Sequence, residues 1–278
     1  MKKIALLLAL SFAFVSCGSD DDDSTPTPIL GCTDDTSINY NPNATEDNNS
    51  CEYPRLTFKF TQNWDGDNVT GEGFGNYDFT NEKGDLLSLL KLRYLISKII
   101  LHKDNGESIT FEGYNLVDLS DINTLLFNAE EEVPLGTYSG LTFIYGFDEN
   151  DNIRNEYLDL NTASWNWPAM LGGGYHFMQM EGNWIDSNGT PQPYAYHNGT
   201  ARVSQNVFEQ NFIAVELPGF TITNNAEVEI KMNIAEWYRN PNTWDLSQMS
   251  TSLMGNYDAQ ILMNQNGQNV FSLGEINQ

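Results

Sequence analysis

The sequence predicts an all-β fold, an antiparallel β-sandwich of Ig-like or Greek-key type with a few short helical turns. From residue 54 onward, apolar and polar residues alternate in one segment after another, which is the period of a half-buried strand. Clusters of Gly, Asn, Asp and Pro separate these segments, and there is no regular succession of strand, helix and strand. Short antiparallel strands in two packed sheets satisfy these observations.

The alternating segments give the expected strands in chain order. Tight turns are expected at the tripeptides DNG, SNG and HNG, because Asn-Gly adopts the backbone angles of a two-residue hairpin. The segment 86–92 (LLSLLKL) fits either a strand entry or a turn of helix, and 234–241 (IAEWYRNP) predicts a helical turn that ends before Pro241. The expected strands are 55–64, 92–103, 108–119, 138–148, 174–182, 194–203, 210–217 and 226–234.

The N-terminus predicts export and lipidation. Residues 1–16 are a basic pair followed by an apolar run that is too short to span a bilayer, which is typical of a signal peptide. Cleavage before Cys17 predicts that this cysteine is acylated, although an ordinary signal peptide with a free cysteine is the alternative. Residues 17–30 contain four consecutive Asp and a Pro-Thr stretch, which predict a disordered, flexible tether.

The Cys-Gly-Ser-Asp-Asp-Asp-Asp sequence at Cys17 resembles the acidic export signal of Bacteroidetes surface lipoproteins. The resemblance implies an outer-membrane lipoprotein, exposed at the surface or facing the periplasm, that touches the membrane through its lipid anchor alone. The formal net charge of -25 leaves no basic face, so a nucleic-acid partner is not expected. Aromatic residues make up 12% of the chain, which argues for a folded domain over residues 54–278.

Residues 31–53 predict a small disulfide loop. Cys32 and Cys51 flank a segment rich in Asp and Asn, and two such cysteines in an oxidising compartment most simply form one disulfide. The segment resembles the thrombospondin-type-3-like loops of secreted Bacteroidetes proteins, which implies calcium binding; a solvated loop without metal is equally compatible with its sequence. Calcium prefers several oxygen ligands, and the candidates are Asp34, Asp35, Asn39, Asn41, Asn43, Glu46 and Asp47.

The order of segments from Leu56 to the C-terminus resembles the MbnP family, copper-binding partners of MauG-like dihaem proteins. The segments that carry the resemblance are LTFKF, LLKLRYLISKIIL, YNLVDLSD, GTYSGLTFIYGFD, the W.W…GY.F…EG block, H.G and NGQNVF. The resemblance implies copper held by imidazoles together with a Trp that the dihaem partner oxidises to kynurenine. Imidazole nitrogen is a suitable copper ligand.

The candidate metal ligands are therefore the three histidines of the chain. His197 occupies the position of the family's H.G and is the strongest candidate. His176 lies in the segment GYHFM, and His102 follows an expected strand, where a surface role is the alternative. Met178 and Met180 are expected to share a strand face with His176 and to pack in the core.

Trp165 and Trp167 are the candidates for oxidation, because the W.W…GY block matches the family's Trp-bearing segment. Two residues apart in a strand, they are expected to lie on one face. Three roles stay open for them: ordinary core packing, an exposed redox patch beside the Gly172–Gly174 run, and a platform for stacking sugars.

No enzyme is predicted, because the chain has no GxSxG, no HExxH and no phosphate-binding Gly loop. Three functions follow as hypotheses. The first is a copper-binding envelope lipoprotein that presents its metal, and a modified Trp, to a dihaem partner. The second is a surface glycan-binding or adhesive lipoprotein of the same fold, and the third is a purely structural envelope protein.

Overall fold

The computed structural model describes residues 26–278. The expected signal peptide, Cys17 and the acidic run lie outside the described residues. The strands are β1 (Leu30–Gly31), β2 (Glu46–Asp47), β3 (Arg55–Trp64), β4 (Asp67–Asn68), β5 (Phe79–Thr80), β6 (Leu86–Lys103), β7 (Ser108–Asp118), β8 (Leu126–Glu132), β9 (Gly136–Tyr145), β10 (Met178–Ile185), β11 (Pro191–Asn198), β12 (Ala201–Ser204), β13 (Val207–Glu209), β14 (Ile213–Pro218), β15 (Thr221–Ile222), β16 (Ala226–Asn233) and β17 (Phe271–Asn277). The helices are α1 (Leu158–Thr162) and α2 (Tyr257–Gly267), with short 3-10 turns η1 (Gly71–Gly73), η2 (Ile122–Leu125), η3 (Ala169–Leu171), η4 (Ile234–Tyr238) and η5 (Leu253–Gly255).

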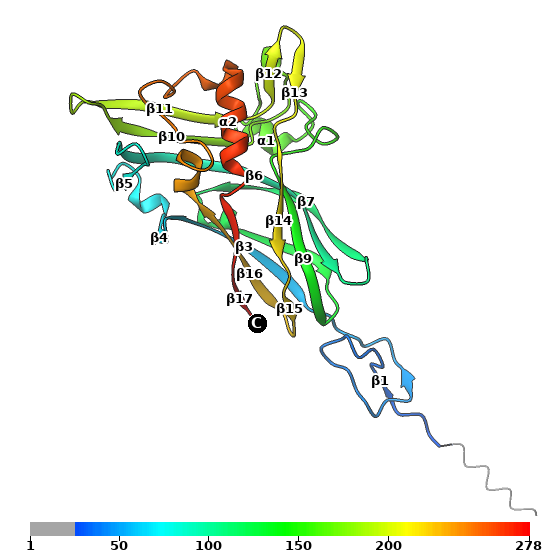
Figure 1. Cartoon of the computed structure of the whole chain (residues 1–278). Helices are drawn as coiled ribbons and strands as arrows, with labels where there is room; N and C mark the ends of the chain where they lie inside the picture. The colour runs from blue at the N-terminus through cyan, green and yellow to red at the C-terminus, as the bar shows by residue number, and fades with distance from the viewer. Residues whose placement is uncertain (1–25) are drawn as a thin grey trace, which may run out of the picture.

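Two sheets form the sandwich within this described part, which confirms the predicted fold class (Figure 1). The larger sheet has the order β11-β10-β6-β9-β14, with β5 and β7 also paired to β6 and β15 to β9, and all its pairings are antiparallel. The smaller sheet has the order β17-β16-β3-β4, with β8 paired to β3. One pairing in it, β16 with β3, is parallel.

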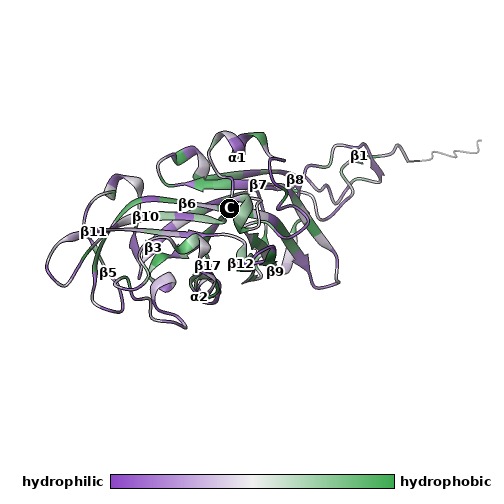
Figure 2. Cartoon of the chain, turned by 90° about the horizontal axis from the view of Figure 1, so that it is seen from above, coloured by the Kyte–Doolittle hydropathy of each residue, from purple (hydrophilic) through white to green (hydrophobic). Residues whose placement is uncertain are grey.

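Alternation along the strands builds the core between the sheets. In β3 every second residue from Leu56 to Gln62 is buried, and hydrophobic and hydrophilic colours alternate along the sandwich strands in Figure 2. Phe60 of the smaller sheet packs edge-on against Tyr94 of the larger sheet, with ring centroids 6.5 Å apart. The side-chain amide of Gln62 donates to the buried Tyr94 hydroxyl at 2.7 Å, so this hydroxyl has a hydrogen-bond partner in the core. Each such buried aromatic contributes about 1.5–3 kcal/mol from the loss of exposed apolar surface.

The N-terminal module lies beyond one end of the sandwich, with α1 and the β12–β13 hairpin toward the other (Figure 1). Its predicted disulfide is present between Cys32 and Cys51, which are 19 residues apart in sequence. β1 and β2 form a parallel pair, so the ordered module begins by Leu30. The backbone N–H of Leu135 donates to the carbonyl of Thr36 at 2.7 Å and ties the module to the sandwich.

The acidic and amide side chains of this module mostly bond its own backbone. Asp34 accepts from Thr36, Asn41 from Asn43, and Asp47 from Asn49, each two residues ahead. These are Asx turns, which Asp and Asn form readily in loops. Asp35, Asn39, Asn43 and Glu46 are exposed or partly exposed. Calcium binding by this module stays a prediction.

The long strand β6 positions the segment that bears the two Trp residues. It pairs with β10 through residues 87–94 and with β9 through residues 96–103. Between these pairings, the N–H of Gly146 donates to the carbonyl of Leu95 at 2.8 Å, and the N–H of Leu95 donates to the carbonyl of Phe177 at 3.0 Å. The connection from β9 to β10 therefore leaves and returns at one point of β6, and its 30 intervening residues form a compact structure there.

Three elements differ from the expectations. Residues 86–92 are strand, so the helical alternative for them is wrong, whereas η4 confirms the turn before Pro241. The expected strand 194–203 divides into β11 and β12 at Gly199. Helix α2 was not anticipated, because its buried face mixes apolar and polar residues and so lacks an apolar stripe: Ala259, Gln260, Met263, Asn266 and Gly267. Among the described residues, no helix has both the length and the apolar character to span a membrane.

Candidate functional site

The Trp-bearing segment folds back on itself just before β10. The N–H of His176 donates to the carbonyl of Trp165 at 2.8 Å, and the N–H of Trp167 donates to the carbonyl of Gly174 at 2.9 Å. The turn between these bonds passes through η3 and the Gly172–Gly174 run, whose φ angles are all positive (119°, 72° and 77°). Residues with a Cβ rarely adopt such angles, which accounts for the three glycines.

Two of the three histidines meet at this place. The ring centroids of His176 and His197 are 5.3 Å apart, with the rings nearly perpendicular. The indoles of Trp165 and Trp167 lie 5.5 and 4.9 Å from the His176 ring, measured between centroids. The sheet therefore gathers the strongest ligand candidate, a second histidine and both Trp candidates.

One nitrogen of each imidazole is held by an oxygen. Nδ1 of His176 lies 3.0 Å from the carbonyl oxygen of Trp165, and Nε2 of His197 lies 2.9 Å from Oε1 of Glu181. Both oxygens can only accept, so these nitrogens carry the protons of the neutral rings. Nε2 of His176 and Nδ1 of His197 then keep their lone pairs, and neither has a hydrogen bond to another described residue.

Burial keeps both rings neutral. It lowers the pKa of His176 to about 3, against a partial opposing effect of the hydrogen bond to Trp165. The pKa of His197 is also lowered, first by burial, although Glu181 favours its charged form. Neutral imidazole is the form that binds metals. The pair is therefore ready for a metal at neutral pH without first losing protons.

The spacing of the pair fits a shared metal. A metal bound to an imidazole nitrogen at about 2.0 Å lies about 3 Å from the ring centroid, so two rings that share it have centroids at most about 6 Å apart. The observed 5.3 Å satisfies this limit with a bent arrangement. Over residues 26–278 no cluster of three or more His, Cys, Asp or Glu side chains has metal-binding geometry.

His102 is apart from this pair. Its Nε2 lies 2.8 Å from the hydroxyl of Thr142, near the far end of β6. It is nine positions along β6 from Arg93, which is about 30 Å of extended chain. Of the three candidate ligands, His176 and His197 therefore form a pair, and His102 is a separate residue.

Met178 and Met180 pack in the main core, as expected. They do not share a face with His176, because β10 begins only at Met178 and the period of two does not extend back to His176. His176 instead turns toward His197, whose cross-strand partner in β10 is Gln179. The thioethers are therefore on the opposite side of the sheet from the imidazole pair.

Both Trp side chains are buried, with exposures of 0% for Trp165 and 1% for Trp167. The indole N–H of Trp167 donates to the carbonyl of Leu171 at 3.1 Å, whereas the indole N–H of Trp165 has no partner among the described residues. The expectation of an open face beside the Gly172–Gly174 run is wrong, because Gly172 lies against Thr200 and Phe208. Neither indole offers a surface on which a sugar can stack.

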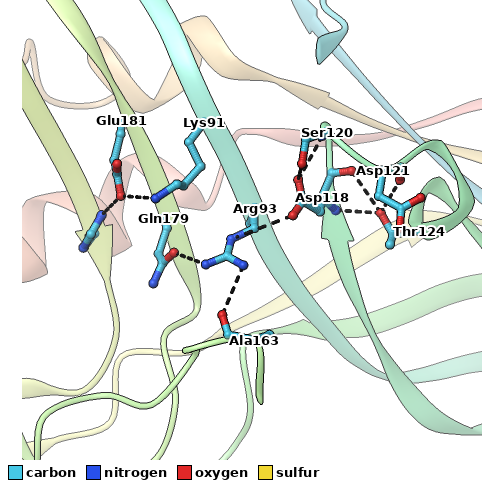
Figure 3. Close-up of polar contacts among 10 residues, drawn as sticks. Lys91, Arg93, Asp118, Ser120, Asp121, Thr124, Ala163, Gln179 and Glu181 are labelled. Atoms are coloured by element: carbon cyan, nitrogen blue, oxygen red, sulfur yellow. Dashed lines mark hydrogen bonds and ion pairs between the residues drawn. The ribbon is translucent and has the colours of Figure 1, made fainter. Parts of the chain in front are cut away.

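A row of charged side chains on the outer face of the sheet was not foreseen. Lys91 donates to Glu181 at 2.8 Å, and Arg93 donates to Gln179 and to the carbonyl of Ala163 (Figure 3). The Arg93 guanidinium also lies 5.0 Å from the centre of the Trp165 ring. These residues occupy polar positions of the alternating segments that form β6 and β10. Only the pairing of the two strands shows that the side chains meet.

The comparisons with known proteins identify the family and the fold. The family model MbnP matches residues 53–255, which include every residue of the site. The fold is similar to that of MbnP from Methylosinus trichosporium, with a TM-score of 0.50 and 14% sequence identity over 81% of this chain and 99% of that chain. No curated protein matches the sequence. Because the family model covers most of the chain, the protein belongs to the MbnP family.

Proposed function

We propose that this protein is an envelope lipoprotein that binds copper through Nε2 of His176 and Nδ1 of His197. The observation that carries the proposal is the 5.3 Å approach of two neutral imidazoles, each with one nitrogen held by an oxygen and the other left without a partner. A ligating histidine usually has its second nitrogen fixed in this way. Membership of the MbnP family supports copper as the metal.

The donor set favours copper over harder cations. Imidazole nitrogen suits copper, and divalent copper heads the order of affinities for nitrogen sites, whereas Ca²⁺ and Mg²⁺ prefer oxygen. Cuprous copper accepts few ligands, which suits a site with two protein nitrogens. Copper held by His176 and His197 would supply a redox-active centre, and the indoles of Trp165 and Trp167 lie 5.5 and 4.9 Å from the His176 ring. The residues of the chain contribute by holding both rings at a fixed separation, with the His176 side chain buried.

We extend the proposal to the neighbouring indoles: Trp165 or Trp167 is the residue that a dihaem partner oxidises to kynurenine. Both lie within 5.5 Å of the His176 ring. In the net change the indole takes up three water molecules and its C2–C3 bond breaks. C2 leaves as formic acid, C3 becomes a ketone, the nitrogen stays as an aniline, and four electrons and four protons are released. The oxidising equivalents come from the haem partner, and burial of the indoles requires them to arrive by electron transfer through the protein.

Copper uptake by matched histidine variants tests the metal site. Wild-type protein and His102→Ala, purified without metal, should each bind one equivalent of copper by elemental analysis after desalting. His176→Ala and His197→Ala should bind substantially less, because one remaining imidazole cannot hold the ion tightly. Full uptake by both of these variants, with circular dichroism unchanged, would contradict the copper proposal and leave the glycan-binding and structural hypotheses.

Peptide mass spectrometry of residues 155–184 tests the Trp modification. Protein made alone should contain two intact Trp residues. Protein from its native host, or co-expressed with an adjacent gene for a dihaem protein, should contain one Trp that has lost a carbon and gained an oxygen. Two intact residues in the presence of an active dihaem partner would restrict Trp165 and Trp167 to a packing role.

A further inference from the structure

We propose that Glu181 is a positioning residue of this site. It holds Nε2 of His197, is itself held by Lys91, and so presents Nδ1 of His197 to the metal, while His176 presents Nε2. The inference rests on the proposed copper site. It adds that the two histidines bind through different ring nitrogens, Nε2 of His176 and Nδ1 of His197. Lys91 and Glu181, which do not themselves bind the metal, determine which nitrogen His197 offers.

The strand pairing places the three side chains in one row. Lys91 of β6 is directly opposite Glu181 of β10, and His197 of β11 is opposite Gln179, two residues before Glu181. Positions two apart in a strand share a face, so Glu181 is the diagonal neighbour of His197. The ammonium of Lys91 and Nε2 of His197 both bond Oε1 of Glu181, at 2.8 and 2.9 Å. Lys91 therefore fixes the same oxygen that orients the imidazole (Figure 3).

The chemistry of the groups determines the tautomer. An ionised carboxylate only accepts hydrogen bonds, so Nε2 of His197 must carry the ring proton. A neutral imidazole has one N–H, which leaves the lone pair on Nδ1. The opposite tautomer would place the Nε2 lone pair against Oε1 and lose the hydrogen bond. The carboxylate thus selects the tautomer of His197 that can bind a metal through Nδ1.

Among residues 26–278, no other side chain on this face forms a hydrogen bond with the His197 ring. Gln179, directly across from His197, is engaged by the guanidinium of Arg93. The carbonyl of His197 accepts from the side chain of Gln260 at 2.8 Å, which fixes the backbone and leaves the ring orientation open. Glu181 is therefore the side chain on which the direction of the His197 ring depends.

The first experiment needs no copper. Long-range ¹H–¹⁵N spectra of the metal-free wild-type protein should show His197 protonated at Nε2 and His176 protonated at Nδ1. Glu181→Ala should give a mixture of tautomers at His197 alone, and Glu181→Gln, whose amide oxygen still accepts, should restore the Nε2–H form. Protonation of wild-type His197 at Nδ1, or an unchanged tautomer in Glu181→Ala, would overturn the inference.

The second experiment measures copper affinity by competition with a chelator. Glu181→Ala should weaken binding about 10–100-fold, the usual effect of removing a partner of a ligating histidine, with Lys91→Met intermediate and Glu181→Gln close to wild type. The matched control is Glu227→Ala, because Lys59–Glu227 is a cross-strand ion pair of 3.0 Å with similar exposure in the smaller sheet. It should leave affinity unchanged.

The two proposals fail in different ways. Copper affinity that is lost in His176→Ala and His197→Ala but unchanged in Glu181→Ala would remove the positioning role and keep the copper site. Affinity that is unchanged in the histidine variants would remove the copper site, while the tautomer spectra would still decide the role of Glu181. Circular dichroism of every variant checks the fold, and Glu181→Gln and Lys91→Met preserve the test if Glu181→Ala is unstable.

Discussion

At the scale of single residues, the site depends on histidines that are kept neutral by burial. His176 is 5% exposed, and its pKa falls to about 3 from an ordinary value of 6.5. In the unfolded chain the ring takes up a proton below about pH 6.5, whereas in the folded protein it stays neutral until about pH 3. The unfolded state therefore binds more protons between these values, and folding stability decreases as the pH falls.

This asymmetry predicts that the metal-free protein loses stability between about pH 6.5 and pH 5, above the range in which most carboxylates titrate. The slope contributed by His176 should approach about 1.4 kcal/mol per pH unit. His176→Gln removes the titrating ring and should show a shallower dependence in urea denaturation at several pH values. Equal slopes for the two proteins would mean that His176 is accessible to protons in the folded state.

At the scale of elements, the end of β11 is shaped to admit an indole. A Cβ at Gly199 would lie 2.7 Å from the Trp167 ring, closer than side chains approach. The glycine of the HNG tripeptide therefore provides space for Trp167 rather than a hairpin turn, and it divides the expected strand into β11 and β12. The side chain of Gln260 on α2 accepts from the Gly199 N–H at 3.1 Å and holds this junction in place.

Gly199→Ala should accordingly destabilise the protein by about 1–3 kcal/mol, the usual cost of overpacking a core. It should also change the near-ultraviolet circular dichroism, because Trp167 must move against His176. Gly140→Ala is the control, since a Cβ there meets its nearest atom at an ordinary 3.4 Å in β9. Similar melting temperatures for Gly199→Ala and wild type would show that the Trp167 side chain can move away from the added methyl group at little cost in stability.

At the scale of the whole molecule, the order of parts along the chain suits a tethered protein. In the sequence the disulfide module precedes the sandwich. His197 is next to the last residue of β11 in the larger sheet, and the β12–β13 hairpin, which follows β11 in the chain, lies toward the end of the sandwich away from the module (Figure 1). Tyr157 and Tyr175, 5.5 Å apart by ring centroids, pack in the same small cluster as Trp165, which is separate from the main core.

The anchor itself is predicted by the sequence at Cys17. If this cysteine is acylated, Cys17→Ser should move the protein from the membrane fraction to the soluble fraction, because no other attachment is proposed. Fractionation of cells followed by immunoblotting measures the distribution. A variant that remains in the membrane fraction would mean that another part of the chain holds it there.

The sequence by itself determined the fold class, most strand positions, the Cys32–Cys51 disulfide and the family, since these follow from alternation, turn residues, cysteine chemistry and the order of short motifs. It also supplied His176, His197, Trp165 and Trp167 as candidates. The tertiary structure was needed to show that His102 is remote from the other two histidines and that both indoles are buried. It was also needed to show that Glu181, bonded to Lys91, accepts a hydrogen bond from His197. The physical reason is that strand pairing joins residues far apart in the chain. Register, and with it which side chains face one another, is fixed by packing of the whole sheet rather than by any local pattern.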